Sequence, residues 1–222
     1  RIYADIYIGD VWSFKTVSYL VVDDMESYTD DLGNRIFETW IDGLGYTYPP
    51  PGHPGNGTGS KVGYREPPYA EQTIVYQGKR SIPFSYDNST ANYSQAERRF
   101  DTPQNWSRCG IKALSLRFYG DLNNEPEPMY LAVQDTAGIS AVVVHEDADV
   151  TLMETWQGWT ICLEEFTNQG VNLTGISSIA IGFGNRDNPQ PGGRGTVYFD
   201  DIQLSTYPCP IAGEPNECKV YI

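Results

Sequence analysis

The sequence predicts an all-β protein folded as an antiparallel β-sandwich, on three observations. Apolar and polar residues alternate with a period of two over many short segments, as they do along half-buried strands. Clusters of Gly, Pro, Asn and Asp separate these segments in the manner of turns. No long run shows helical periodicity. Eight or more short strands at this spacing indicate a sandwich.

The strands follow from this alternation in order along the chain. In the clearest one, Leu114, Leu116 and Phe118 fall on one side, whereas Arg117 and Tyr119 fall on the other. The expected strands cover 81–86, 113–119, 129–134, 141–145, 159–163, 179–183 and 196–204. Short helical turns are expected at 103–107 and 163–168.

A long irregular stretch, residues 42–68, interrupts the strands. It contains seven glycines and six prolines together with Tyr46, Tyr48 and Tyr64. Loops of this length are usually functional or disordered, and the aromatic residues favour an ordered loop.

We expect one module at 21–207, with flanks at 1–20 and 208–222. Residues 2–8 are similar to 197–204, so the first flank is either the last strand of a preceding module or a strand end that merely looks alike.

Charge narrows the choice of partners. The chain has 15 Lys and Arg against 29 Asp and Glu, a formal net charge of −14. Nucleic acid and anionic membrane surfaces require clustered basic residues, so both are disfavoured. No apolar run is long enough to predict membrane insertion. An acidic surface suits a neutral ligand, or one bound through divalent cations.

Four cysteines occur without a Cys-x-x-Cys motif and with only two histidines, which argues against a zinc site. Cys209 and Cys218 flank a short loop with Pro and Gly, where a disulfide would staple the tail. Cys109 and Cys162 are then either a second bridge or two buried thiols. Disulfides, together with an excess of Asn-x-Ser/Thr motifs, favour an extracellular or cell-surface protein.

Carboxylates gather near both ends of the expected module. Asp24 and Glu26 fall on one side of the first strand, and Asp200 and Asp201 lie in the last one. If these strands are neighbours, the acids meet and repel unless a cation such as calcium neutralises them. The alternative is a rim of solvated carboxylates.

Several short motifs occur in an order that resembles the jelly-roll carbohydrate-binding modules attached to bacterial glycoside hydrolases and surface proteins. The motifs are Asp23-Asp24-Met25-Glu26, Gln77-Gly78-Lys79-Arg80-Ser81-Ile82, Leu114-Ser115-Leu116-Arg117-Phe118-Tyr119-Gly120-Asp121, Trp159-Thr160-Ile161-Cys162-Leu163, Ile179-Ala180-Ile181-Gly182-Phe183 and Val197-Tyr198-Phe199-Asp200-Asp201-Ile202. The resemblance implies a jelly roll and a structural calcium ion. It implies Glu26 and Asp201 as calcium ligands, with Asp24 and a carbonyl near Gly78 or Lys79. The long loop at 42–68 departs from the family pattern.

A glycan site needs flat aromatic surfaces for the C–H faces of sugars and planar polar groups for the hydroxyls. The expected ligand-binding residues are Tyr46, Tyr48, Tyr64, Tyr86, Arg117, Tyr119, Tyr130 and Gln134, with Tyr93 and Trp156 as further candidates. We expect Arg117, Tyr119, Tyr130 and Gln134 to share one polar sheet face, walled by tyrosines of the 42–68 loop. Tyrosines that simply cover sheet edges are the alternative. Trp40, Trp106 and Trp159 are expected in the core.

The sequence therefore predicts an extracellular, non-catalytic module that binds polysaccharide. No set of nucleophile, base and orienting residue stands out, and no catalytic residue is predicted. The first alternative is a structural repeat of a surface array or filament, docked to neighbouring modules of the same protein. The second is a jelly-roll polysaccharide lyase.

Overall fold

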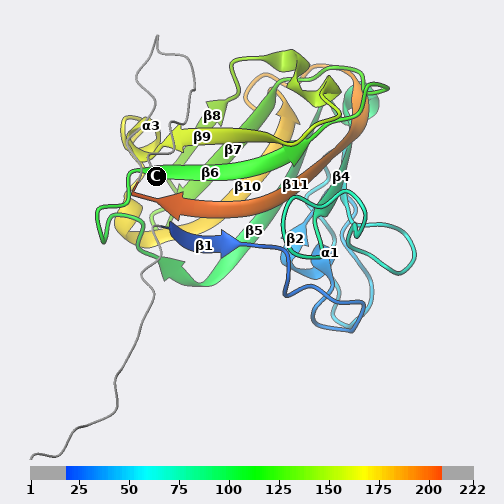
Figure 1. Cartoon of the computed structure of the whole chain (residues 1–222), viewed down its shortest axis with the longest axis horizontal. Helices are drawn as coiled ribbons and strands as arrows, with labels where there is room; N and C mark the ends of the chain where they lie inside the picture. The colour runs from blue at the N-terminus through cyan, green and yellow to red at the C-terminus, as the bar shows by residue number, and fades with distance from the viewer. Residues whose placement is uncertain (1–18, 207–222) are drawn as a thin grey trace, which may run out of the picture.

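The computed structural model describes residues 19–206, which form two antiparallel β-sheets packed face to face. Sheet A has the order β3 (Ser60–Val62), β4 (Ile82–Asp87), β11 (Arg194–Ser205), β6 (Ala113–Tyr119) and β9 (Gln157–Cys162), and β1 (Tyr19–Asp23) also pairs with β11. Sheet B has the order β2 (Trp40–Ile41), β5 (Tyr93–Gln104), β10 (Ile176–Gly184), β7 (Met129–Asp135) and β8 (Ser140–Val144). In Figure 1, sheet A crosses in front of sheet B. The predicted antiparallel jelly-roll β-sandwich is confirmed.

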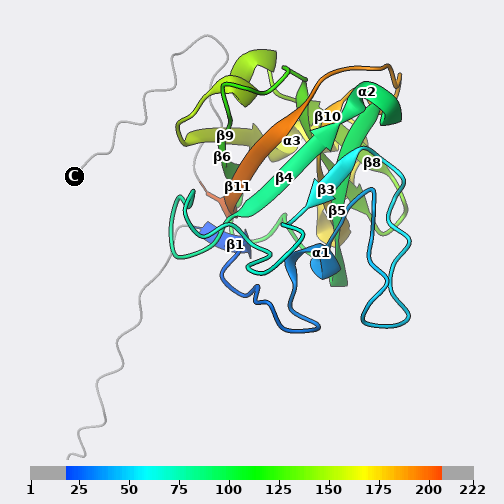
Figure 2. The ribbon, with the colours of Figure 1, turned by 90° about the vertical axis from the view of Figure 1, so that its right-hand side faces the viewer.

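Short helices connect the strands. They are α1 (Ile36–Thr39), α2 (Asn88–Ala91) and α3 (Leu163–Thr167), with 3₁₀ turns η1 (Ala148–Leu152) and η2 (Leu173–Gly175). Within residues 19–206, no helix is long and apolar enough to cross a bilayer. The segments between β1 and β4 gather at one side of the sandwich in both views of the ribbon (Figure 1 and Figure 2).

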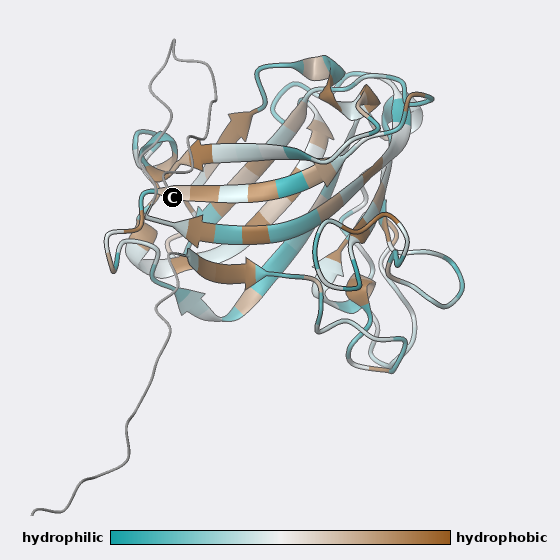
Figure 3. Cartoon of the chain, in the orientation of Figure 1, coloured by the Kyte–Doolittle hydropathy of each residue, from teal (hydrophilic) through white to brown (hydrophobic). Residues whose placement is uncertain are grey.

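The core lies between the sheets and follows the predicted alternation. Apolar and polar residues alternate along β6 and β11 (Figure 3), and Leu114, Leu116 and Phe118 are buried. At the centre, Phe84 makes edge contacts with Phe183 and Phe199 at centroid distances of 5.3 and 5.9 Å. Such tilted aromatic packing adds stability beyond the burial of area.

Strand β5 is the longest strand that the sequence analysis missed, besides the short strands β2 and β3. Arg98 lies on the side of β5 that faces inward. Because a charged residue stands where an apolar one is expected, the sequence of β5 does not show a clear alternation of apolar and polar residues. Arg98 pairs with the buried carboxylate of Asp23, which also accepts bonds from the Tyr28 hydroxyl at 2.5 Å and from Trp40 Nε1 at 2.9 Å. The buried charge is thus paired and hydrogen-bonded, as burial of a charge requires.

Three expectations about local structure have different outcomes. The helical turn expected at 103–107 is wrong, because Gln104 ends β5 and accepts a bond from Trp106 Nε1. The turn expected at 163–168 is found as α3. The 42–68 stretch is ordered: Asp42 Oδ1 accepts from the backbone of Leu44 and Gly45, and the stretch contains β3.

The first strand begins at Tyr19, two residues before the expected start of the module at 21, and β11 ends at Ser205. The rest of the flanks expected at 1–20 and 208–222 lies outside the described residues.

Candidate functional site

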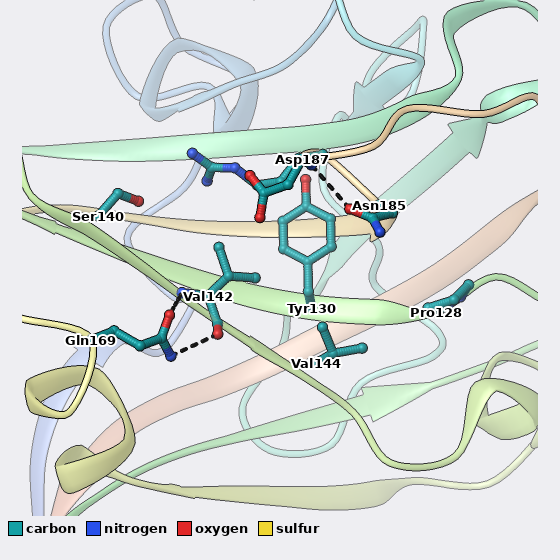
Figure 4. A pocket seen from close by; sticks show the side chains of 9 residues that line it. Pro128, Tyr130, Ser140, Val142, Val144, Gln169, Asn185 and Asp187 are labelled. Atoms are coloured by element: carbon teal, nitrogen blue, oxygen red, sulfur yellow. Dashed lines mark hydrogen bonds between the residues drawn. The ribbon is translucent and has the colours of Figure 1, made fainter.

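A hollow of about 550 Å³ lies on the outer face of sheet B. Its walls come from β7, β8, the turn after α3 and the loop between β10 and β11. The lining residues are Pro128, Tyr130, Ser140, Val142, Val144, Gln169, Asn185, Arg186 and Asp187. Figure 4 shows the Tyr130 ring beside Val142 and Val144, with the polar groups of the β10–β11 loop next to it. Apolar and polar groups therefore face the same space.

Tyr130 forms the floor of the hollow and is held in place. Its cross-strand partner is Gly182, where an added Cβ would lie 2.2 Å from the ring. The ring can therefore lie across β10 only because this position has no side chain. The hydroxyl donates to Gln95 Oε1 at 3.1 Å, and burial raises the pKa of Tyr130. The phenol stays neutral over the physiological range.

The rim supplies planar polar groups. Arg186 Nη1 donates to Gln95 Oε1 at 3.3 Å, so the Gln95 amide oxygen connects Arg186 to Tyr130. Asn185 Oδ1 accepts from the backbone of Asp187 at 3.0 Å, which shapes the loop and leaves the Asp187 side chain exposed. Donor and acceptor groups thus stand next to each other above an apolar floor.

Gln169 forms the opposite wall and protects a sheet edge. Its side-chain amide donates to Val142 O at 2.9 Å and accepts from Val142 N at 3.0 Å. The side chain therefore pairs with edge strand β8 as a neighbouring strand would. An edge blocked in this way cannot add another strand at this point.

The structure separates the residues that were expected to share one face. Strand β6 belongs to sheet A and β7 to sheet B, so Arg117 and Tyr119 lie on one outer surface and Tyr130 on the opposite one. The expectation of a shared face is wrong. Alternation predicts on which side of a strand a residue lies, but not to which sheet the strand belongs. Gln134 bonds to Gly138 O at 3.2 Å and does not line the hollow.

The other predicted tyrosines have separate environments. Tyr86 is buried in the core, stacked on Phe183 at 4.4 Å, so its prediction as a ligand-contacting residue is wrong. Its hydroxyl donates to Glu125 O. Tyr46 packs near Phe37, and Tyr48 is exposed; neither lines the hollow.

A second group of aromatic residues covers part of the outer face of sheet A. We call it the aromatic surface, and it consists of Tyr64, Tyr76, Arg117, Tyr119, Trp156 and Tyr198. Tyr76 and Tyr198 were not among the predicted site residues. The alternation in β11 could have revealed Tyr198, since Val197 and Phe199 point inward. Tyr76 comes from an irregular segment, and no sequence pattern marks it.

The predicted acidic group also assembles. Strands β1 and β11 are paired, with a register shift at Val21/Asp23, and Asp201 has a positive φ of 47°. Burial raises the pKa of Asp201, and the charges of Asp24 and Glu26 raise it further. Glu26 Oε1 accepts from the backbone N–H groups of Lys79 and Arg80 at 2.8 and 2.9 Å.

These carboxylates are close enough to repel one another, but they do not form a complete ligand set. Within residues 19–206, no three or more His, Cys, Asp or Glu side chains are arranged to hold a metal ion. The donor set is nevertheless all oxygen, as calcium prefers. The backbone donors of Lys79 and Arg80 both bind Glu26 Oε1, and among residues 19–206 no hydrogen bond reaches its other carboxylate oxygen.

Among the remaining candidates, Cys109 is exposed and free, whereas Cys162 is disulfide-bonded. The predicted Cys109–Cys162 bridge is therefore wrong. Cys109 sits in an exposed turn with a positive φ of 58°, whereas Cys162 ends β9. The predicted Cys209–Cys218 pair lies outside the described residues.

His145 serves a packing role. Its ring lies 5.8 Å from Phe118 and 5.1 Å from Trp159, and burial lowers its pKa. The Nδ1 atom accepts from the backbone N–H of Asp147.

No protein-family model and no curated protein matches the sequence. Solved structures do match it. The family 11 carbohydrate-binding module of cellulosomal cellulase Lic26A-Cel5E of Clostridium thermocellum is similar with a TM-score of 0.54 and 14% identity, over 86% of this chain and 96% of that chain. This chain folds like that module. A family 11 module from Clostridium thermocellum in complex with a β-1,3-1,4-mixed-linked tetrasaccharide has a TM-score of 0.50 and 15% identity, over 86% and 97%.

The resemblance that the sequence motifs suggested is thereby confirmed at the level of the fold. Identities of 14 and 15% are too low to carry binding residues from one chain to the other. Function has to be argued from this chain's own surfaces.

Proposed function

We propose that this chain is a non-catalytic module that binds neutral polysaccharide in the hollow on sheet B. One observation carries the proposal: an apolar floor of Val142 and Val144, supported by the buried Tyr130 ring, lies beneath donor and acceptor side chains in a single concave space. The solved family 11 module of similar fold, in complex with its tetrasaccharide, supports the ligand class.

The chemistry of the hollow matches a sugar. Val142 and Val144 offer apolar contact for C–H groups, whereas the Tyr130 ring, only 1% exposed, supports them from below. Arg186 is a pure donor and ionised Asp187 a pure acceptor, whereas a sugar hydroxyl can both donate and accept. Neighbouring hydroxyls of one sugar can therefore satisfy both side chains at the same time.

The setting that we propose is outside the cell, where the module would tether a larger protein to its glycan. A disulfide at Cys162 supports an oxidising compartment.

The experiment is a glycan array followed by calorimetric titration, with the β-1,3-1,4-mixed-linked tetrasaccharide as the first probe. Arg186→Ala and Asp187→Asn should each weaken binding about 10-fold or more, since a hydrogen bond to a charged group contributes about 1.5–3 kcal/mol. The matched controls are Arg108→Ala and Asp101→Asn, which change exposed residues outside the hollow. Unchanged affinity in the hollow variants would place the glycan elsewhere.

One observation favours the structural alternative if no glycan binds. Strand β1 exposes Tyr19, Leu20 and Val21, with exposed fractions of 37, 37 and 51%. An apolar edge strand can pair with a neighbouring module. Concentration-dependent self-association in sedimentation, without binding to any glycan, would support that alternative.

We also propose a structural calcium ion between β1, β11 and the segment before β4. Asp24, Glu26 and Asp201 would supply its carboxylate oxygens. Burial raises the pKa of Asp201, and the nearby charges of Asp24 and Glu26 raise it further; this like-charge group supports a cation at this point.

A further inference from the structure

The aromatic surface on sheet A is a continuous row of rings drawn from distant parts of the chain. Tyr198 on β11 and Tyr119 on β6 are direct cross-strand partners, with ring centroids 6.2 Å apart. Trp156, just before β9, lies 5.7 Å from both Tyr119 and Tyr76. Tyr76 comes from the segment before β4. The fold therefore gathers these rings on one face.

Buried carboxylates fix Tyr64 and Tyr76, two of the three members of the row that lie on loops. Asp200, which is fully buried, accepts from the backbone N–H groups of Tyr76 and Gln77 at 2.9 and 3.2 Å. Glu71, 7% exposed, accepts from the Tyr64 hydroxyl. The rings are thus positioned in advance, which lowers the entropic cost of binding a ligand.

The guanidinium group of Arg117 completes the surface. It lies 4.7 Å from the centre of the Tyr76 ring, and an added Cβ at its cross-strand partner Gly158 would lie 2.4 Å from Arg117 Nη1. The guanidinium is therefore confined between a ring and a bare strand. Its charge acts on nearby Asp201, whose pKa it lowers, but within residues 19–206 it forms no ion pair shorter than 4.0 Å.

The polar ends of these rings also differ from those of the core. In the core, Tyr86 donates to Glu125 O and Trp40 donates to Asp23. By contrast, the hydroxyls of Tyr76 and Tyr119 and the Nε1 of Trp156 have no hydrogen-bond partner among residues 19–206. These three polar atoms are therefore available to a ligand, whereas the hydroxyl of Tyr64, at the other end of the aromatic surface, is taken by Glu71.

We propose that the aromatic surface is a second glycan-binding site, which takes a neutral polysaccharide segment. The pyranose C–H faces would lie on Tyr76, Tyr119 and Trp156, and Arg117 would donate to ring or hydroxyl oxygens. The ligand class rests on the proposed function, but the site is separate. The hollow lies on the outer face of sheet B and the aromatic surface on the outer face of sheet A. The two sites therefore face opposite directions. One module would then contact two glycan chains.

A polysaccharide fits this surface better than a protein partner does. Tyr76, Tyr119 and Trp156 each combine a flat ring with a polar atom, and the three rings are in contact with one another through Trp156. The core of a protein interface is well packed with its polar groups at the rim. Alternating aromatic faces and hydrogen-bond donors match the alternating C–H and hydroxyl groups of a sugar.

The experiment compares two double variants in calorimetric titrations with the tetrasaccharide, or with the strongest oligosaccharide from the array. Tyr76→Ala/Trp156→Ala removes the centre of the aromatic surface, and Arg186→Ala/Asp187→Asn removes the rim of the hollow. Tyr19→Ala is the matched control, because Tyr19 is 37% exposed, close to the 42% of Tyr76, and lies on sheet A outside the row. Circular dichroism verifies that each variant is folded.

The wild type should bind two oligosaccharides per chain and cross-link the polymer into a precipitate. Each double variant should keep one oligosaccharide and lose cross-linking, whereas the control should keep both properties. A wild-type stoichiometry of one, abolished only in the hollow variant, overturns the second site and leaves the proposed function intact. Loss of binding only in the aromatic-surface variant overturns the hollow instead. Absence of any glycan binding, or capture of a protein by the aromatic surface alone, overturns the proposal.

Discussion

At the scale of single residues, buried carboxylates decide where loop aromatics stand. Glu71 Oε1 accepts from the backbone of Gln72 and Ile74 at 2.9 and 3.0 Å, whereas its other oxygen accepts from the Tyr64 hydroxyl. One ionised side chain thereby shapes its own turn and orients a ring on the aromatic surface. Burial opposes this ionisation, but the bonds from Tyr64 and the backbone outweigh it and hold the pKa of Glu71 below its usual 4.5.

This lowered pKa predicts an acid-sensitive contribution to stability. Because the folded pKa lies below the unfolded value, the contribution is present above about pH 4.5 and is lost as the pH falls through the folded pKa. Glu71→Gln should therefore be less stable than the wild type at pH 7, and the difference should shrink below pH 4.5. Thermal unfolding between pH 3 and 7 measures this, with the exposed Glu66→Gln as control. Parallel profiles for wild type and Glu71→Gln would contradict the prediction.

At the scale of elements, the pairing of β7 with β10 builds the floor of the hollow. Tyr130 and Gly182 are partners in register, and the ring covers the glycine. Together with Ala132 and Ala180, Tyr130 forms a small apolar cluster on the outer face of sheet B. Small residues on β10 therefore leave space for a large ring on β7.

Gly182→Ala tests this arrangement. The added Cβ would lie 2.2 Å from the Tyr130 ring, so the ring must move. We expect a loss of about 1–3 kcal/mol in the free energy of unfolding, as for other overpacked sites, together with weaker glycan binding in the hollow. Gly175→Ala is the control, because there the nearest atom is the Thr136 hydroxyl at 3.1 Å. Equal stability and affinity in the two variants would show that the ring does not depend on the glycine.

The same elements show what the sequence could predict. Alternation in β6 identified its buried side correctly, because burial depends on local periodicity. In β7 it identified Met129, Leu131 and Val133 as core residues, but Tyr130 and Ala132 on the other side are buried too. It could not show that the two strands join different sheets, since that depends on long-range pairing. The aromatic surface was hidden for the same reason: Tyr76 reaches it through the bonds of its backbone to Asp200, which lies 124 positions away in sequence.

At the scale of the whole molecule, the acidic group lies where the two ends of the described fold meet. Strand β11 pairs with β4 through Arg194–Phe199 and with β1 beyond Asp200–Asp201, so these aspartates occupy the point where its neighbour changes. We call this point the junction. Glu26 accepts from the backbone of Lys79 and Arg80, and so ties the segment before β4 to the junction. A cation here would join β1, β11 and the segment before β4. Without a cation, the like charges oppose that assembly.

The proposed calcium ion therefore predicts opposite effects of one substitution in two conditions. In Asp201→Asn the side chain keeps nearly the same shape but loses its charge. Asparagine also tolerates the positive φ of this position. With calcium, the variant should melt below the wild type, because an ion at a thousandfold excess over its dissociation constant stabilises by about 4 kcal/mol. In chelator, the variant should melt above the wild type, because a repelling carboxylate is gone. Asp101→Asn, remote from the junction, should show neither shift. The prediction fails if the variant and the wild type melt in the same order in both conditions and elemental analysis finds no metal. The junction then holds no calcium, and its carboxylates are only solvated neighbours.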